Sequence, residues 1–302
     1  MSKSFYSNGK LLLAGEYAVL DGAHAWAIPT KFGQSLQVSE NNSSLLSWKS
    51  YDEKGSIWFE GLYKIEPLSE VSNSDAEMAS TLLNILLEAQ KLNPTFLVES
   101  NGYEVETKLD FPKNWGLGTS STLINNVANW ANINPYTLLK ATFDGSGYDI
   151  ACAQHDLPIS FHINEGAPVV VEVKKEIPFA DALYFIHLNQ KKNSREAISD
   201  YGNLNIDRDA FVSKISAISK RMIGSQTLQD FEWLISSHEN EISETLGLKI
   251  VKSSLFSDYW GAIKSLGAWG GDFILATGNE ETPDYFQKKG YPTVIPFNDM
   301  IL

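Results

Sequence analysis

Residues 112–121 read Pro-Lys-Asn-Trp-Gly-Leu-Gly-Thr-Ser-Ser, and this stretch decides the fold of the 302-residue chain. Gly116 and Gly118, separated by one residue, let the backbone turn tightly and approach an anion closely. The three hydroxyl residues after them begin the apolar-periodic stretch 123–128, where they predict a helix N-cap and offer oxygens to a phosphate or Mg²⁺. Because a helix start adds free N–H groups, the stretch predicts a phosphate-binding loop leading into a helix. An ordinary glycine turn is the alternative.

Two further glycine segments lie far from this loop in the sequence. Residues 7–22 form an apolar, strand-like run with Lys10 near its head and Gly-Glu near its tail, and residues 266–276 form a glycine turn leading into an apolar strand. Together with the loop, these segments resemble the three signature motifs of the GHMP kinases, the galacto-, homoserine, mevalonate and phosphomevalonate kinases. The motifs occur in the family's order and span nearly the whole chain.

A fourth segment narrows the resemblance. Residues 145–153, Gly-Ser-Gly-Tyr-Asp-Ile-Ala-Cys-Ala, look like a stretch of the phosphomevalonate kinases. Residues 15–19 and 270–272 also resemble the phosphomevalonate kinase versions of their motifs. The resemblance implies a kinase that uses ATP and Mg²⁺ to phosphorylate a mevalonate-pathway metabolite in isoprenoid biosynthesis, with 5-phosphomevalonate as the first candidate and mevalonate as the alternative. A non-catalytic relative that senses nucleotide or metabolite also stays open, because a fold can persist without its chemistry.

The resemblance also implies roles for particular residues. Lys10 and Asp149 are the expected catalytic residues. Lys10 provides positive charge near the transferred phosphate, and Asp149 matches the family's catalytic aspartate, which lies near the acceptor and acts as its base or orients it. The ATP-binding positions are Gly116, Leu117, Gly118, Thr119, Ser120 and Ser121, and Ser120 also matches the Mg²⁺-binding serine. The expected substrate contacts are Glu16, His24, Ser146, Gly147, Lys191, Ser194, Arg195, Gly270, Gly271 and Asp272. Among these, Glu16 is expected to brace the site rather than to react.

Some assignments leave alternatives open. Residues 190–195 form a basic segment that suits an anionic acceptor, although an exposed basic loop explains it equally well. No glutamate occurs between Ser121 and Asp149, so the second Mg²⁺ ligand is not identified, and Asp144 is a weak substitute. Trp48 and Trp58 could stack on adenine, but aromatic residues of a hairpin are more often core.

Composition supports a soluble metabolic enzyme, and the resemblance implies a small-molecule substrate. The formal net charge of -13 argues against nucleic acid as a partner, because such binding needs phosphate neutralisation by Lys and Arg. No apolar run approaches the roughly 20 residues of a membrane span, and the start of the chain lacks the apolar core of a signal peptide, so we expect a cytoplasmic protein without a membrane partner. Cys152, the single cysteine, excludes an intrachain disulfide. The sequence leaves the oligomeric state open, with a homodimer as one possibility.

The residue pattern predicts an α+β fold. Following the resemblance, we expect two domains of the GHMP kinase type, an N-terminal ATP-binding domain over 1–175 and a C-terminal domain over 176–302, with the active site in the cleft between them. One helix is expected to be capped by Ser72 or Ser74. The predicted strands are 10–20, 26–38, a hairpin over 45–63, 102–111, 168–173, 182–188, 274–277 and 294–297. The predicted helices after the loop helix are 135–142, one carrying Asp149, 208–222, 228–242, 255–266 and 283–289.

Overall fold

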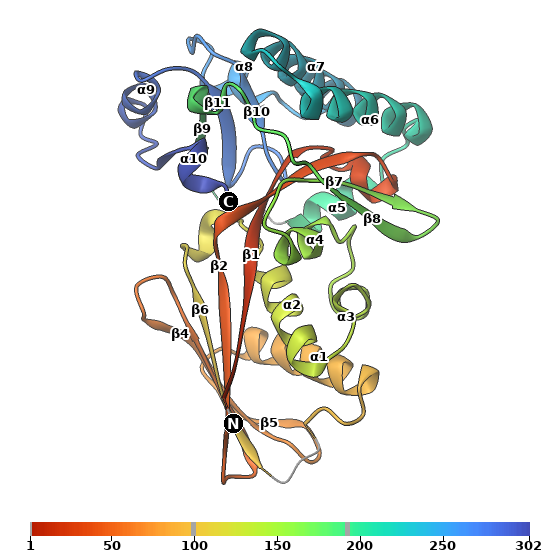
Figure 1. Ribbon diagram of the computed structural model, residues 1–302, viewed down its shortest axis with the longest axis vertical. Helices are drawn as coiled ribbons and strands as arrows, with labels where there is room; N and C mark the ends of the chain where they lie inside the picture. Colours follow the sequence, from red (N-terminus) through yellow and green to blue (C-terminus); the bar gives the residue numbers. More distant parts are fainter. Residues whose placement is uncertain (1, 98–100, 191–193) are drawn as a thin grey trace. The chain divides into compact units, whose positions relative to one another are not determined.

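The structure is a computed structural model that describes residues 2–97, 101–190 and 194–302, and it confirms an α+β fold (Figure 1). Its contacts group the chain into two compact units. Unit 1 comprises Met1–Gly9, Phe32–Lys113 and Leu117–Gln154, and unit 2 comprises Lys10–Lys31, Asn114–Gly116 and His155–Leu302. These units differ from the contiguous ranges 1–175 and 176–302, because the strands β1 (Ser2–Ala14) and β2 (Ala25–Asn41) each contribute residues to both.

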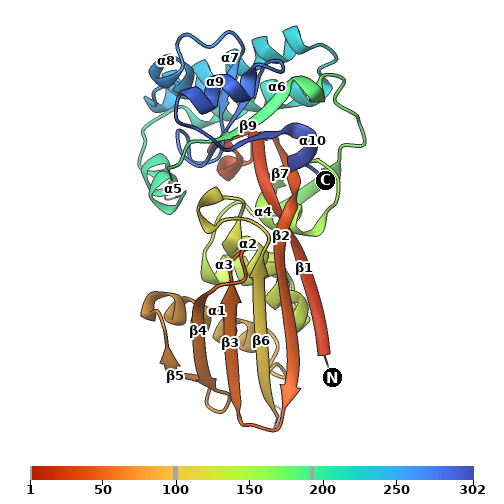
Figure 2. The same cartoon turned by 90° about the vertical axis from the view of Figure 1, so that its left-hand side faces the viewer.

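In unit 1, helices cover one face of a sheet. The sheet order is β5-β4-β3-β6-β2, and Figure 2 shows β5, β4, β3 and β6 side by side. The strand bounds are β3 Leu45–Tyr51, β4 Ile57–Lys64, β5 Ser69–Asn73 and β6 Gly102–Leu109. The helices are α1 Ala76–Leu92, α2 Thr119–Ala131, α3 Pro135–Thr142 and α4 Tyr148–Gln154. The core between the sheet and the helices includes Trp48, Phe59, Tyr63, Leu86 and Ile124.

Local chemistry explains two features of unit 1. The predicted hairpin is confirmed as β3 and β4, and its turn uses Gly55 at φ 81° and the Asp52 carboxylate, which accepts from two backbone N–H groups. The predicted cap of α1 is wrong, because Asp75 accepts from the N–H groups of Glu77 and Met78. Ser72 instead belongs to β5, a polar and mostly exposed strand that hydrophobic periodicity does not reveal.

In unit 2, β2 pairs with β7 (Ile159–Asn164), and β7 pairs with β8 (Ala167–Glu172). A separate sheet has the order β10-β11-β9-β12, with bounds Ile263–Ser265, Phe273–Thr277, Leu183–His187 and Val294–Pro296. The helices are α5 Ser194–Gly202, α6 Arg208–Gly224, α7 Leu228–Leu246, α8 Val251–Leu255, α9 Thr282–Lys288 and α10 Phe297–Met300. Short 3₁₀ helices span Ala18–Asp21, Lys113–Trp115 and Ala180–Ala182.

Two predicted elements of unit 2 are wrong in extent or type. The strand predicted over 10–20 ends at Ala14, because Gly15 at φ 106° and Tyr17 at φ 60° turn the chain. The helix predicted over 255–266 is absent, since α8 ends at Leu255 and residues 263–265 form β10. A Cβ on Gly261 would lie 1.9 Å from the Thr277 carbonyl oxygen, so the chain enters β10 directly against β11. Among the described residues, no helix combines the length and apolar character needed to cross a membrane.

Candidate active site

The glycine loop leads into α2 as predicted, but its cap differs. Gly116 and Gly118 have φ of 67° and 91°, and Gly118 is the N-cap of α2 without a side-chain hydrogen bond to the helix start. The predicted hydroxyl cap is therefore wrong. The Ser121 hydroxyl instead donates to the Gly118 carbonyl (2.9 Å), whereas Ser120 is exposed. The N-cap residue thus offers no side-chain acceptor to the first N–H groups of α2, which suits a helix start that binds an anion.

Buried polar contacts fix α2 within unit 1. The Ser7 hydroxyl of β1 donates to Asn126 Oδ1 (2.8 Å) and accepts from Asn125 Nδ2 (2.9 Å). Thr122 donates to Gln34 Oε1 of β2 (2.8 Å). Because buried hydrogen bonds are directional and costly to leave unmade, they set the position of α2 more sharply than apolar packing alone.

Asp149 lies half-buried in the first turn of α4, which packs against α2. Just before it, Gly147 has φ 86°, and a Cβ there would lie 3.0 Å from a ring carbon of Tyr136. Burial raises the pKa of Tyr136 to about 12, with smaller contributions from Cys152 and Asp149. Unit 1 therefore contains the loop from Leu117 onward and Asp149, on two helices in contact with each other.

In unit 2, residues from all three glycine motifs come together. Lys10 Nζ donates to the Gly116 carbonyl oxygen (3.0 Å). A Cβ on Gly116 would lie 2.3 Å from Asp272 Oδ2, so the glycine backbone lies directly against this carboxylate. Asp272 is fixed by its own backbone, which accepts from Leu188 N and donates to the Gln190 carbonyl, each at 2.7 Å. Lys10 thus brings positive charge to the loop in a chain of net charge -13.

The large side chain of Trp115 packs within unit 2. Its ring meets Phe273 edge to face at 5.4 Å, and His187 lies beside both rings. His187 Nε2 lies 3.1 Å from the carbonyl oxygen of Asn114, the residue before Trp115. The loop residues 114–116 are therefore held against β9 and β11.

Glu16, which we expected among the substrate contacts as a residue that braces the site, has a side chain with no exposed surface, so a direct substrate contact is not what the structure shows. Its Oε1 lies 2.7 Å from Lys264 Nζ, and its Oε2 lies 3.2 Å from His238 Nε2. The sequence reasoning missed these partners. A signal was present, because His238 and Glu239 fall on the buried face of α7 and Lys264 lies within an apolar run.

Of the remaining predicted substrate residues, the structure describes the side chains of some and leaves others outside its description. His24 stacks on His162 with ring centroids 4.1 Å apart; burial lowers its pKa, as do His162 and Lys220 to a smaller extent. In the third motif, Gly270 has φ 76° and Gly271 is buried, while Ser146 is half-buried in unit 1. Lys191 lies outside the described residues. Ser194 and Arg195 begin α5, and their side chains lie outside the description.

The two tryptophan candidates for the adenine site differ. Trp48 is 1% exposed and belongs to the core of unit 1. Trp58 is partly buried, and Lys113 Nζ of the loop lies over its ring, 4.1 Å from the centroid. Only Trp58 is therefore beside the loop with part of its surface open.

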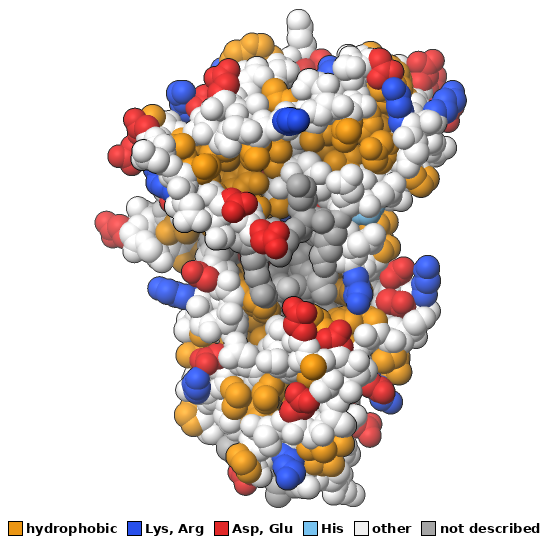
Figure 3. Space-filling view, turned by 180° about the vertical axis from the view of Figure 1, so that it is seen from behind, with side chains coloured by type: hydrophobic (Ala, Val, Ile, Leu, Met, Phe, Trp, Pro, Cys, Tyr) orange, Lys and Arg blue, Asp and Glu red, His pale blue; other side chains and the backbone are white. Residues whose placement is uncertain are grey.

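Mg²⁺ has one candidate protein ligand in the loop, the exposed hydroxyl of Ser120. No group of three or more His, Cys, Asp or Glu side chains able to hold a metal occurs among the residues described. Asp144 is exposed at φ 60° just after α3. On the described part of the face in Figure 3, basic side chains lie interspersed with acidic ones. Residues 116–121 thus offer hydroxyls and no carboxylate, whereas Mg²⁺ at phosphate sites is usually bound through one or two carboxylates together with waters and substrate phosphates.

Comparison with known proteins places this fold. No family model matches the sequence, and no curated protein matches it. Among solved structures, it is similar to the Methanococcus jannaschii mevalonate kinase, with 15% identity, TM-score 0.67 and coverage of 96% of this chain and 94% of that one. It is also similar to the Streptococcus pneumoniae phosphomevalonate kinase in complex with phosphomevalonate and AMPPNP, with 14% identity, TM-score 0.67 and coverage of 95% of each chain. A third similar structure is the Lactococcus lactis galactokinase complexed with galactose, with 13% identity, TM-score 0.67 and coverage of 98% of this chain and 94% of that one. The chain therefore has the GHMP kinase fold, as the motifs predicted.

Proposed function

We propose that this protein is a small-molecule kinase that transfers the terminal phosphate of ATP to a small acceptor. The observation that carries the proposal is the meeting of Lys10, Gly116 and Asp272, one residue from each of three distant glycine motifs. A structural glycine turn does not require a lysine ammonium bonded to its carbonyl. Phosphoryl transfer does require positioned positive charge beside a close-approach backbone, because catalysis rests on orientation and charge neutralisation.

Each part of the candidate site has a role in this reaction. The backbone of residues 116–121 and the start of α2 bind the phosphates of ATP, and the Ser120 hydroxyl contributes to holding Mg²⁺. Bound Mg²⁺ would neutralise phosphate charge during transfer. Lys10 neutralises charge developing on the transferred group. Asp149 orients the acceptor, and it serves as a base only where the acceptor presents a hydroxyl proton.

We propose 5-phosphomevalonate as the acceptor and mevalonate as the alternative. Residues 145–149 support the first choice, because Gly-Ser-Gly-Tyr-Asp resembles the corresponding stretch of phosphomevalonate kinases. The similar fold of the Streptococcus pneumoniae phosphomevalonate kinase, solved with phosphomevalonate and AMPPNP, is consistent with it. Trp58 is the proposed stacking residue for adenine.

An ADP-release assay with 5-phosphomevalonate, mevalonate, homoserine and galactose in parallel tests the proposal. We expect Mg²⁺-dependent turnover that is fastest with 5-phosphomevalonate and falls ~100-fold in Asp149→Asn, the usual scale for a positioned acid/base group. The control is Asp209→Asn, which alters an exposed carboxylate in the first turn of α6. ATP binding without turnover of any acceptor would instead favour the sensor.

A further inference from the structure

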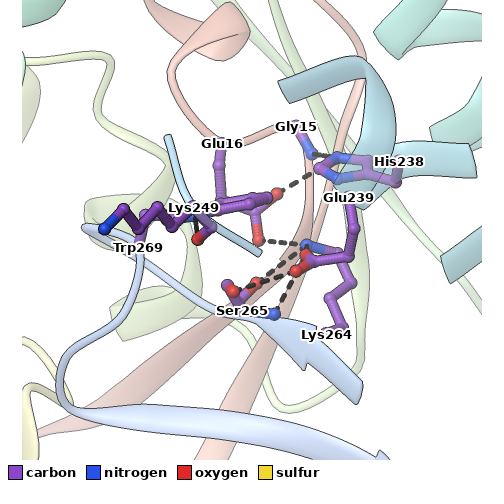
Figure 4. Close-up of polar contacts among 8 residues, drawn as sticks. All are labelled: Gly15, Glu16, His238, Glu239, Lys249, Lys264, Ser265 and Trp269. Atoms are coloured by element: carbon purple, nitrogen blue, oxygen red, sulfur yellow. Dashed lines mark hydrogen bonds and ion pairs between the residues drawn. The ribbon is translucent and has the colours of Figure 1, made fainter. Parts of the chain in front are cut away.

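A cluster of buried charges lies at the roots of the first and third glycine motifs of unit 2. We call Glu16, His238, Glu239, Lys264 and Ser265 the buried charge cluster (Figure 4). Lys264 Nζ lies 2.7 Å from Glu16 Oε1 and 3.9 Å from Glu239 Oε1. Glu239 accepts from both Ser265 N (3.0 Å) and Ser265 Oγ (2.9 Å). The side chains of Glu16, His238 and Lys264 are 0% exposed, so the cluster lies beyond the reach of any substrate.

The cluster has several ionisable side chains whose pKa values burial shifts. It contains two carboxyl groups and one ammonium, and burial, reinforced by the Lys264 charge, lowers the pKa of His238 well below its ordinary value. Burial raises the pKa of Glu239 to about 8, against the opposing effect of Lys264. Burial likewise raises the pKa of Glu16, against the opposing charge and hydrogen bond of Lys264. The protonated carboxyl of Glu239 and the neutral imidazole of His238 are therefore the favoured forms at pH 7.

The cluster ties two unusual backbone segments together. Glu16 lies between Gly15 (φ 106°) and Tyr17 (φ 60°), where β1 has just ended, and the Gly15 N–H faces His238 Nε2 at 3.3 Å. Lys264 and Ser265 belong to β10, which leads into the third motif. That motif contains left-handed residues at Gly267, Trp269, Gly270 and Asp272, with φ of 60°, 56°, 76° and 49°.

A second contact secures the same turn. Trp269 Nε1 donates to the Lys249 carbonyl oxygen (2.8 Å). Non-glycine residues in the left-handed region persist only where the surroundings over-determine them. Here the support comes from β10 on one side and from residue 249 on the other, and the turn ends at Asp272 against Gly116.

Stability alone does not explain these charges. Replacing a buried ion pair with apolar residues of similar volume is often neutral or stabilising, whereas charged groups restrict the geometry in which a segment can pack. We propose that Glu16, Glu239 and Lys264 are positioning residues that lock the turn 267–272 and so hold Asp272 against Gly116. Their link to turnover rests on the proposed kinase function, whereas their effect on the turn does not.

Hydrogen exchange of the purified, full-length protein tests the lock without any assay of activity. The test variant is the double substitution Glu16→Gln with Lys264→Met, which removes the ion pair without leaving an unpaired buried charge. We expect amide exchange in 267–272 to accelerate at least about tenfold, while the core strand β9 exchanges as in wild type. The control, Lys214→Met, breaks an exposed ion pair with Glu241 between α6 and α7 and should leave the turn unchanged.

A second pair of variants covers the case in which the double variant does not fold. Glu239→Gln reproduces the protonated carboxyl and can keep both bonds to Ser265, whereas Glu239→Met loses them. We expect rapid exchange of the turn in Glu239→Met and exchange close to wild type in Glu239→Gln. Equal exchange of 267–272 in these two variants and wild type would overturn the lock.

A kinetic measurement tests the link between the turn and turnover. Where exchange accelerates, we expect kcat to fall at least about tenfold with KM for ATP nearly unchanged, the pattern of a lost transition-state contact. Faster exchange with unchanged kcat would overturn the link to turnover alone, and an inactive wild type would overturn only the proposed function.

Discussion

Replacing Gly116 with alanine tests the meeting of the glycine motifs most directly. The new Cβ would lie 2.3 Å from Asp272 Oδ2 and 2.4 Å from its Cγ, whereas ordinary contact begins at 3.4 Å. Either the loop or the carboxylate must therefore move by about 1 Å, a misplacement that can cost ~100-fold in rate. Alanine at φ 67° also costs about 1–2 kcal/mol, because its Cβ crowds the following carbonyl in the left-handed region.

Gly247 provides a closely matched control. It has φ 69°, and a Cβ added there would meet no atom within 4 Å, so Gly247→Ala incurs the backbone cost without the clash. Thermal unfolding of both variants should show a loss of about 1–2 kcal/mol in common and a further loss in Gly116→Ala only. In the ADP-release assay, we expect kcat to fall ~100-fold in Gly116→Ala and to stay near wild type in Gly247→Ala.

A double variant identifies the clashing group. Asp272→Gly removes the carboxylate at a position of φ 49°, which glycine adopts freely. Adding it to Gly116→Ala should recover the additional loss of stability, as expected for directly coupled neighbours. If Gly116→Ala and Gly247→Ala proved equally stable and equally active, the close approach of Gly116 to Asp272 would be refuted.

Three further predictions concern single side chains. Because the pKa of Glu239 is about 8 when folded against an ordinary 4.5, the folded state binds the extra proton, and the free energy of unfolding should fall by up to about 1.4 kcal/mol per pH unit from pH 5 to 8. Urea titrations should show this slope reduced in Glu239→Gln, and an equal slope would contradict the assignment. Lys10→Met should lower kcat ~100-fold, whereas Lys31→Met, which also removes a lysine bond to a backbone carbonyl, should retain activity in the same assay. Ser120→Ala should raise the Mg²⁺ concentration needed for half-maximal activity. Ser121→Ala loses the hydrogen bond to the Gly118 carbonyl and should chiefly lower the melting temperature. The reverse result would assign the Mg²⁺ ligand to Ser121 in place of Ser120.

The sequence determined the features that depend on local backbone chemistry. The Gly116–Gly118 spacing followed by hydroxyls and an apolar period was enough to predict a glycine turn entering a helix, and the structure contains it. Alternation along β6 and the turn after Asp52 were similarly readable, because side-chain periodicity and turn residues act over a few positions. The order of the motifs was enough to predict the GHMP kinase fold.

Only the tertiary structure decided which distant residues meet and which charges are buried. Ser120 and Ser121 are adjacent identical residues, yet one is exposed and the other is bonded to the Gly118 carbonyl. The sequence pattern placed Lys264 in a helix, but it belongs to strand β10, and its ammonium group contacts Glu16. Such contacts join positions up to 248 residues apart, and no local propensity encodes them. They arise because a buried charge must find its partner within the folded core, wherever the chain supplies one.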